Sequence, residues 1–162
     1  MKTILLITLA LFSFRGYASQ EPLQLTPQEQ EIAKNEIREV VKGIFRSLEK
    51  MDVEALFQSY SNSSDFIFFT TDGSMAGLQE AKNHHAAWFK SLSSLKVTTI
   101  RDDFRFLPGN IVICSWLGKF DMTPGSGEQL KINKFGITFI FSKIDNHWKV
   151  IHQHSSALPP VQ

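Results

Sequence analysis

The period of the hydrophobic pattern changes near residue 95, and this change constrains the fold more than any other feature. Before it, apolar residues recur every three or four positions, as on one face of a helix. After it they alternate, which predicts strands at residues 96–106, 111–122, 129–141 and 147–154. The breaks at 108–110, 124–127 and 145–146 are rich in Gly, Pro, Asn and Asp. Connections this short join antiparallel neighbours, so the second half predicts an antiparallel meander.

The first half predicts three helices and one strand. Thr26 and Pro27 are suited to cap and open a helix at residues 27–50, and Asp52 can cap a short helix at 53–57. A strand is expected at 65–71 and a third helix at 77–92. Helices followed by an antiparallel sheet indicate an α+β fold in which the helices cover one sheet face.

The N-terminus has the pattern of a secretory signal peptide. Lys2 precedes an apolar run at residues 4–12, and small residues end at Ala18, where we expect cleavage. The run is shorter than the roughly 20 apolar residues that span a bilayer. The sequence thus predicts a signal peptide at 1–18, a flexible lead-in at 19–26, a domain at 27–157 and a tail at 158–162. We expect export, periplasmic or secreted, without a membrane anchor; an uncleaved N-terminal helix is the alternative.

Charge and cysteine content exclude several classes of partner and scaffold. The 17 basic residues are balanced by 16 acidic ones, so no basic field favours nucleic acid, and we expect none as a partner. Cys114 is the only cysteine and cannot form an intramolecular disulfide. The fold must therefore be stabilised by its core, for which 43% apolar residues suffice.

Two segments resemble the nuclear transport factor 2-like superfamily, which includes SnoaL-like and ketosteroid isomerase-like proteins. They are Lys-Met-Asp-Val-Glu-Ala-Leu at 50–56 and Trp-Lys-Val-Ile-His-Gln-His-Ser-Ser at 148–156. The resemblance implies a cone-shaped, curved antiparallel sheet wrapped around the three helices, with an apolar cavity inside. It also implies a homodimer formed through the outer face of the sheet.

Placed on this resemblance, the catalytic positions of ketosteroid isomerase are changed. Ile44 takes the position of the tyrosine, Thr70 that of the base and Thr138 that of the acid. Threonine is no base near neutral pH and isoleucine donates no hydrogen bond, so we do not expect steroid isomerase activity. We expect these three residues to line the pocket, and Asp72 is a reserve candidate at its mouth.

His152 and His154 form the most conspicuous polar pair on an otherwise apolar strand. Residues two apart on a strand share a face, which places both with Trp148 and Val150. His154 is the predicted polar anchor, or a proton-transfer residue because imidazole titrates near neutral pH. The alternative is a histidine with a structural hydrogen bond. His84 and His85 could supplement a metal site, but adjacent helix residues diverge by about 100°, and we expect neither a metal nor a cofactor.

Aromatic residues complete the predicted pocket. Besides the positions above, the expected lining includes Trp88, Trp116, Phe120, Trp148 and His152. Gly118 and Gly136 either leave room for a ligand opposite these rings or only permit the sheet to bend.

Three functional hypotheses follow. The first is an exported domain that binds a small apolar or aromatic molecule. The second is a cofactor-free isomerase, lyase or cyclase that uses His154 with Asp72 for proton transfer. The third is a structural dimerisation domain whose interior is filled by its own side chains.

Overall fold

The computed structural model describes residues 25–158, and the expected signal peptide and most of the lead-in and tail lie outside this range. Helix α1 (Pro27–Glu49) begins with a reciprocal capping box between Thr26 and Glu29. Helix α2 (Val53–Phe57) is capped by Asp52, whose side chain accepts a hydrogen bond from the amide of Ala55 at 3.0 Å. Both predicted caps are therefore present. No helix of the described range is long and apolar enough to span a membrane.

A short hairpin and a third helix precede the long strands. Strands β1 (Ile67–Phe69) and β2 (Met75–Ala76) are joined by a turn, and α3 (Leu78–Lys90) follows. The sequence pattern missed β2, which has only two residues. The long strands are β3 (Leu92–Leu107), β4 (Ile111–Pro124), β5 (Leu130–Ile144) and β6 (His147–Ala157). Strand β3 begins four residues before the predicted start at 96, because its register with β4 extends to Leu92 and Pro124.

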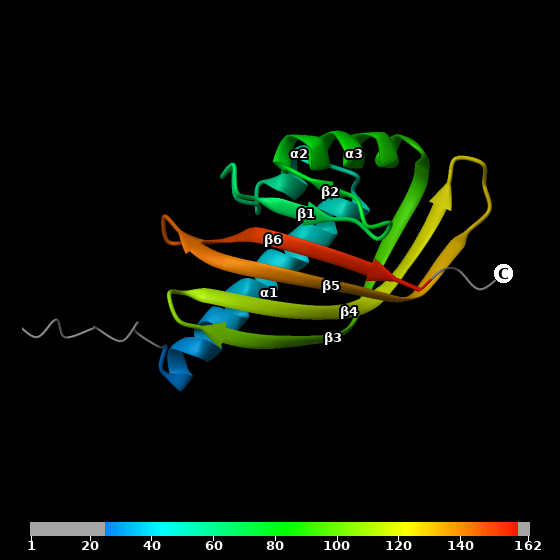
Figure 1. Ribbon diagram of the computed structural model, residues 1–162. Coiled ribbons are helices and arrows are strands. Elements are labelled where there is room, and N and C mark those ends of the chain that lie inside the picture. The colour runs from blue at the N-terminus through cyan, green and yellow to red at the C-terminus, as the bar shows by residue number, and fades with distance from the viewer. Residues whose placement is uncertain (1–24, 159–162) are drawn as a thin grey trace, which may run out of the picture.

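The six strands form one sheet in the order β2-β1-β6-β5-β4-β3. The predicted meander from β3 to β6 is confirmed, and β1 adds to it by parallel pairing with β6, which the sequence did not indicate. Figure 1 shows a curved, unclosed sheet with α1 crossing one face and α2 and α3 lying at the end that carries β1 and β2. The predicted α+β class, with helices in the first half and a curved sheet in the second, is confirmed.

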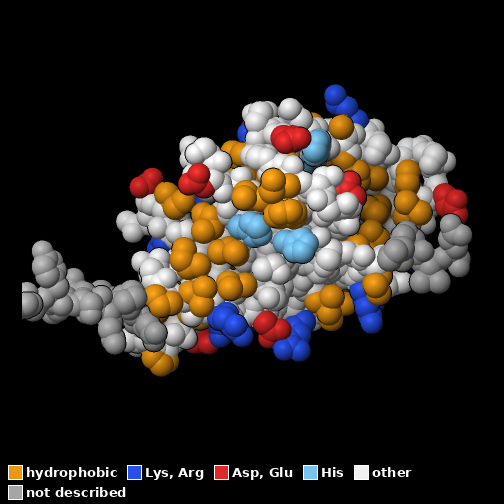
Figure 2. Space-filling view, viewed as in Figure 1, with side chains coloured by type: hydrophobic (Ala, Val, Ile, Leu, Met, Phe, Trp, Pro, Cys, Tyr) orange, Lys and Arg blue, Asp and Glu red, His pale blue; other side chains and the backbone are white. Residues whose placement is uncertain are grey.

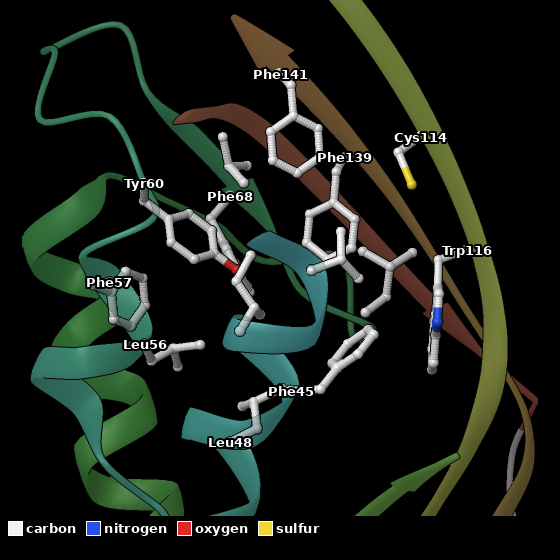
Figure 3. Close-up of a cluster of buried hydrophobic side chains, with 14 of the residues drawn as sticks. Phe45, Leu48, Leu56, Phe57, Tyr60, Phe68, Cys114, Trp116, Phe139 and Phe141 are labelled. Carbon is white, nitrogen blue, oxygen red and sulfur yellow. The ribbon is translucent and has the colours of Figure 1, made fainter. Parts of the chain in front are cut away.

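The core lies between α1, α2 and the inner face of the sheet. Aromatic side chains fill most of it, and Figure 3 shows Phe45 of α1 facing Trp116 and Phe139 of the sheet, with Phe141 beyond Phe139. The Phe45 and Trp116 ring centroids are 4.5 Å apart. Burial of rings of this size contributes most of the stabilising apolar area in a domain without a disulfide.

A β-bulge in β6 reverses the direction of its side chains. Phe141 pairs with Val150, but the preceding Ile140 pairs with His152, so Ile151 is the extra residue. Val150 is buried on the inner face before the bulge, and Gln153 and Ser155 are buried there after it. His152 and His154 share a face, as predicted, but it is the outer face, opposite to Trp148 and Val150. The prediction that both histidines face inward is wrong, because the extra residue Ile151 interrupts the alternation of side-chain direction along β6.

Candidate functional site

A cavity of about 660 Å³ lies between α3, the turn from β1 to β2 and the inner face of the sheet. Its apolar wall consists of residues from α1, β1, α3, β4 and β5: Leu48, Phe68, Ala87, Trp88, Phe120, Met122, Ile132, Phe135 and Ile137. Its polar groups come from the turn, α3 and β6: Thr70, Thr71, Asp72, Ser74, His84, His85, Gln153 and Ser155. A concave, mostly apolar cavity with a few polar groups is the usual form of a small-molecule site.

His85 is the only half-buried histidine on the helix wall of the cavity, since His84 beside it is exposed. Its Nδ1 lies 2.8 Å from the carbonyl oxygen of Ala81, which can only accept, so Nδ1 carries the proton. Burial lowers the pKa of His85, and the neighbouring His84 adds to this effect, while the bond to Ala81 opposes it. His85 is thus neutral near pH 7, and its Nε2 keeps a free lone pair.

The Nε2 atom of His85 is accessible to solvent. This atom makes no hydrogen bond within the described residues. Every buried side-chain nitrogen and oxygen of these residues does have a partner, so Nε2 is not buried. Nε2 must therefore be reached by solvent, and because His85 is one of the residues that line the cavity, we infer that Nε2 points into it. The ring is held by edge-on contacts with Phe57 and Phe68, at centroid distances of 5.2 and 5.3 Å. The cavity thus contains an oriented hydrogen-bond acceptor.

A hydrogen-bonded chain runs from Tyr60 through Gln153 to Ser155, and Gln153 and Ser155 line the cavity on the side of the sheet. The Tyr60 hydroxyl donates to Oε1 of Gln153 at 2.6 Å, and Nε2 of Gln153 donates to Oγ of Ser155 at 3.0 Å. Tyr60 is tied to β6 by two backbone bonds of its neighbours, between Ser61 and Val150 and between Val150 and Ser59. Burial raises the pKa of Tyr60, which keeps its hydroxyl protonated.

Asp72 lies at the mouth of the cavity, where it organises the turn. Its Oδ1 accepts hydrogen bonds from the Thr70 hydroxyl and from the amide of Ser74, the latter at 2.9 Å. These bonds lower the pKa of Asp72 to about 2. Asp72 is therefore ionised under ordinary conditions and is a weak proton acceptor, which does not favour the predicted catalytic role.

Of the residues that the sequence assigned to the pocket, Thr70, Asp72, Trp88 and Phe120 line this cavity. His152, His154 and Thr138 do not: Thr138 pairs with His154 across the strands, and both lie on the outer face. Assigning these three to the cavity is wrong because the bulge at Ile151 and the register of β5 turn them outward. Figure 2 shows histidine side chains among apolar ones over β6 on this outer face.

Ile44, Trp116 and Trp148 belong to the core and not to the cavity, which corrects their assignment as pocket residues. Ile44 is packed beneath the sheet with 1% of its surface exposed. The Trp116 indole donates to Oγ1 of Thr99 at 2.9 Å, and that of Trp148 donates to Oε2 of Glu36 at 2.8 Å. Ile44 and the two indole rings thus fill the part of the interface between α1 and the sheet in which they lie, and none of the three lines the cavity.

The two glycines that could have made room for a ligand do not do so. A side chain at Gly118 would overlap the ring of Trp116, which occupies the space above it. Gly136 lies beside Ser156 on the outer face, because Gly136 and Ser156 are cross-strand partners. The aromatic residues thus fill the space at Gly118 themselves.

Sequence reasoning missed His85, Gln153 and Ser155 as the polar groups of the cavity. The available signal for His85 was its helical spacing from Ala81 and Trp88, which places the three residues on one face of the third helix. Nothing local marked Gln153 and Ser155, because their inward direction depends on the bulge. Within residues 25–158, no group of three or more His, Cys, Asp or Glu side chains is placed to hold a metal ion.

This curved sheet over helices, with a cavity at the open end, is the arrangement of the nuclear transport factor 2-like superfamily. The profile of the SnoaL-like domain matches residues 37–161, and the chain belongs to this family. The search of curated proteins finds no match.

Solved structures share this fold at low identity. A nuclear transport factor 2-like superfamily protein from Salmonella enterica serovar Typhimurium LT2 is 20% identical with a TM-score of 0.72, over 82% of this chain and 94% of the other. A protein provisionally named a scytalone dehydratase, from Novosphingobium aromaticivorans, is 10% identical with a TM-score of 0.74, over 82% and 88%. A provisional dehydratase from Streptomyces avermitilis is 12% identical with a TM-score of 0.71, over 80% and 99%.

Proposed function

We propose that this domain binds a small, mostly apolar or aromatic molecule in the cavity beneath α3. The supporting observation is a cavity of about 660 Å³ whose aromatic wall carries one neutral, oriented histidine, His85. No carboxylate is bonded to His85 among the described residues, and the nearby Asp72 is engaged by Thr70 and Ser74. A histidine in an apolar cavity that is paired with neither a carboxylate nor a nucleophile supports binding more than catalysis.

The proposal is tested by titrating the protein with 2-ethylnaphthalene, which has no polar group, and following binding by fluorescence or calorimetry. Ala87 is an exposed residue of α3 that lines the cavity, and Asn83 is an exposed residue one turn earlier that does not. Ala87→Trp is expected to abolish binding by filling the cavity, and Asn83→Trp to leave it unchanged. Equal affinities in both variants, or no binding to the unchanged protein, would contradict the proposal.

A proton-transfer enzyme is the second candidate, and His85 supports it where His154 does not. His85 has its lone pair toward the cavity and a lowered pKa, so it is deprotonated near pH 7. The expected activity is exchange of the acidic protons beside the carbonyl of a tetralone, followed by NMR in D₂O. Exchange that persists in His85→Leu would remove this candidate.

The homodimer expected from the resemblance remains a proposal, supported by the apolar outer face of the sheet. Phe69, Ile113, Ile140 and Leu117 lie there around His154, and Leu117 is 37% exposed. Apolar side chains gathered on an open sheet face favour association. Light scattering of the purified protein tests this, and a monomer at micromolar concentration would contradict it.

Export also remains part of the proposal, on the strength of the apolar run before Ala18. N-terminal sequencing of the protein recovered from its host is expected to begin at Ser19. A chain that still begins at Met1 would contradict cleavage.

A further inference from the structure

The two walls of the cavity carry complementary hydrogen-bonding groups, and the buried hydroxyl of Tyr60 determines which group the sheet presents. The Tyr60 hydroxyl has Gln153 as its one partner within the described residues. If Gln153 turned its NH₂ group toward Tyr60, the buried O–H would have no acceptor, which costs about 1–3 kcal/mol. Tyr60 therefore holds Oε1 of Gln153 and leaves the amide nitrogen on the side of Ser155.

This arrangement makes the sheet wall a donor. One N–H of Gln153 is bonded to Oγ of Ser155, and the second N–H remains. Oγ of Ser155 already accepts this bond, so its own proton is left to donate. Both residues line the cavity, and their two unused protons make an acceptor, such as a carbonyl oxygen, the ligand group that this wall matches best.

The helix wall has the opposite character. The Nδ1 proton of His85 is used by Ala81, so Nε2 offers only a lone pair to the cavity. A ligand group that meets His85 must donate, as a hydroxyl or an N–H does. Phe68 links the two walls: it contacts the His85 ring edge-on at 5.3 Å and is the cross-strand partner of Gln153.

The charges around the cavity disfavour an anion. The residues that line it include no Lys or Arg, and Asp72 at the mouth is ionised because its pKa is lowered to about 2. His84, also at the mouth, lies 4.0 Å from Glu80. A carboxylate that entered this cavity would lose its hydration without gaining a cationic partner, which is unfavourable.

We propose that the cavity selects an uncharged aromatic molecule with a carbonyl acceptor at one end, for Gln153 and Ser155, and a hydroxyl or N–H donor at the other, for His85. Tyr60 is a positioning residue that keeps the sheet wall a donor. This inference rests on the proposed binding function and names the class of ligand for the same cavity.

Four naphthalenes of similar size separate these contributions in titrations near neutral pH: 2-ethylnaphthalene, 2-acetylnaphthalene, 6-hydroxy-2-acetylnaphthalene and 6-hydroxy-2-naphthoate. Each added hydrogen bond is expected to tighten the Kd about fivefold, so the hydroxyketone binds best. The carboxylate is expected to bind roughly tenfold more weakly than the hydroxyketone.

Variants of the lining residues show which wall of the cavity causes each difference in Kd among the four compounds. Ser155→Ala and Gln153→Met are expected to reduce the advantage of the ketone over 2-ethylnaphthalene, and His85→Phe the advantage of the hydroxyl. Tyr60→Phe is expected to reduce the ketone advantage while 2-ethylnaphthalene keeps its Kd, which a purely structural role for Tyr60 would not produce. His154→Ala, on the outer face, is the control and leaves all four affinities unchanged.

The outcomes separate this inference from the proposed function. Equal affinities for the four compounds, or tightest binding of the carboxylate, would overturn the ligand class while binding in the cavity stands. If 2-ethylnaphthalene fails to bind the unchanged protein, the proposed function itself fails. A ketone preference that survives in both Ser155→Ala and Gln153→Met would overturn the assignment of the donor wall.

Discussion

Replacing Gly118 by alanine tests the conclusion that Trp116, and not a ligand, occupies the space above this glycine. The added methyl group would overlap the indole ring and the carbonyl oxygen of Thr98 on the neighbouring strand. Neither group can move freely. The indole is bonded to Thr99 at 2.9 Å and packs on Phe45 at 4.5 Å, and the carbonyl belongs to the paired backbone of β3. Overpacking of this kind costs about 1–3 kcal/mol, and a clash with backbone favours the upper end.

We therefore expect Gly118→Ala to lower the free energy of unfolding by about 3 kcal/mol, or the Tm by roughly 10 °C. Urea unfolding measures this, with an unchanged m-value showing that the unfolded state is the same. Gly136→Ala is the matched control: its methyl group would come within 3.1 Å of Oγ of Ser156, a side chain on the outer face that can rotate. It is expected to cost less than about 1 kcal/mol.

A second substitution separates the two clashes. Trp116→Phe in the Gly118→Ala background shortens the ring but leaves the Thr98 carbonyl in place, so it should recover only part of the loss. A neutral Gly118→Ala, or equal losses for Gly118→Ala and Gly136→Ala, would refute the assignment of this space to Trp116.

Tyr60→Phe is expected to lower the free energy of unfolding by about 1–3 kcal/mol, measured by urea unfolding. Gln153→Leu removes the same hydrogen bond, so the losses of the two single variants should sum to more than the loss of the double variant. Additive losses would contradict the bond. The pKa of His85 is lowered in the fold from 6.5, so the unfolded chain takes up the proton first and the free energy of unfolding falls as the pH drops below 6.5. His85→Leu should remove this part of the acid sensitivity below about pH 6.5, and an unchanged pH slope would contradict it. His154→Ala is expected to leave proton exchange of a tetralone unchanged, and a loss of exchange would restore the outward histidine as a candidate. Leu117→Glu is expected to dissociate the proposed dimer in light scattering, and a dimer that persists would place the interface elsewhere.

The order of helices and strands could be predicted because it follows from local pattern. The caps at Thr26 and Asp52 and the alternation after residue 95 are properties of neighbouring residues, so α1, α2 and the meander were predicted close to their observed bounds. Strand β2 and the parallel pairing of β1 with β6 were not, because a two-residue strand has no period of its own and a parallel partner is distant in sequence.

The sequence by itself determined the α+β class, the order of helices and strands and the caps of the first two helices. Only the tertiary structure decided which polar groups face the cavity. One inserted residue, Ile151, reverses the side-chain direction along β6, so His152 and His154 turn outward and Gln153 and Ser155 turn inward. A bulge is defined by pairing with another strand, in this case the step from Ile140 to Phe141 on β5, and no pattern within β6 alone contains it.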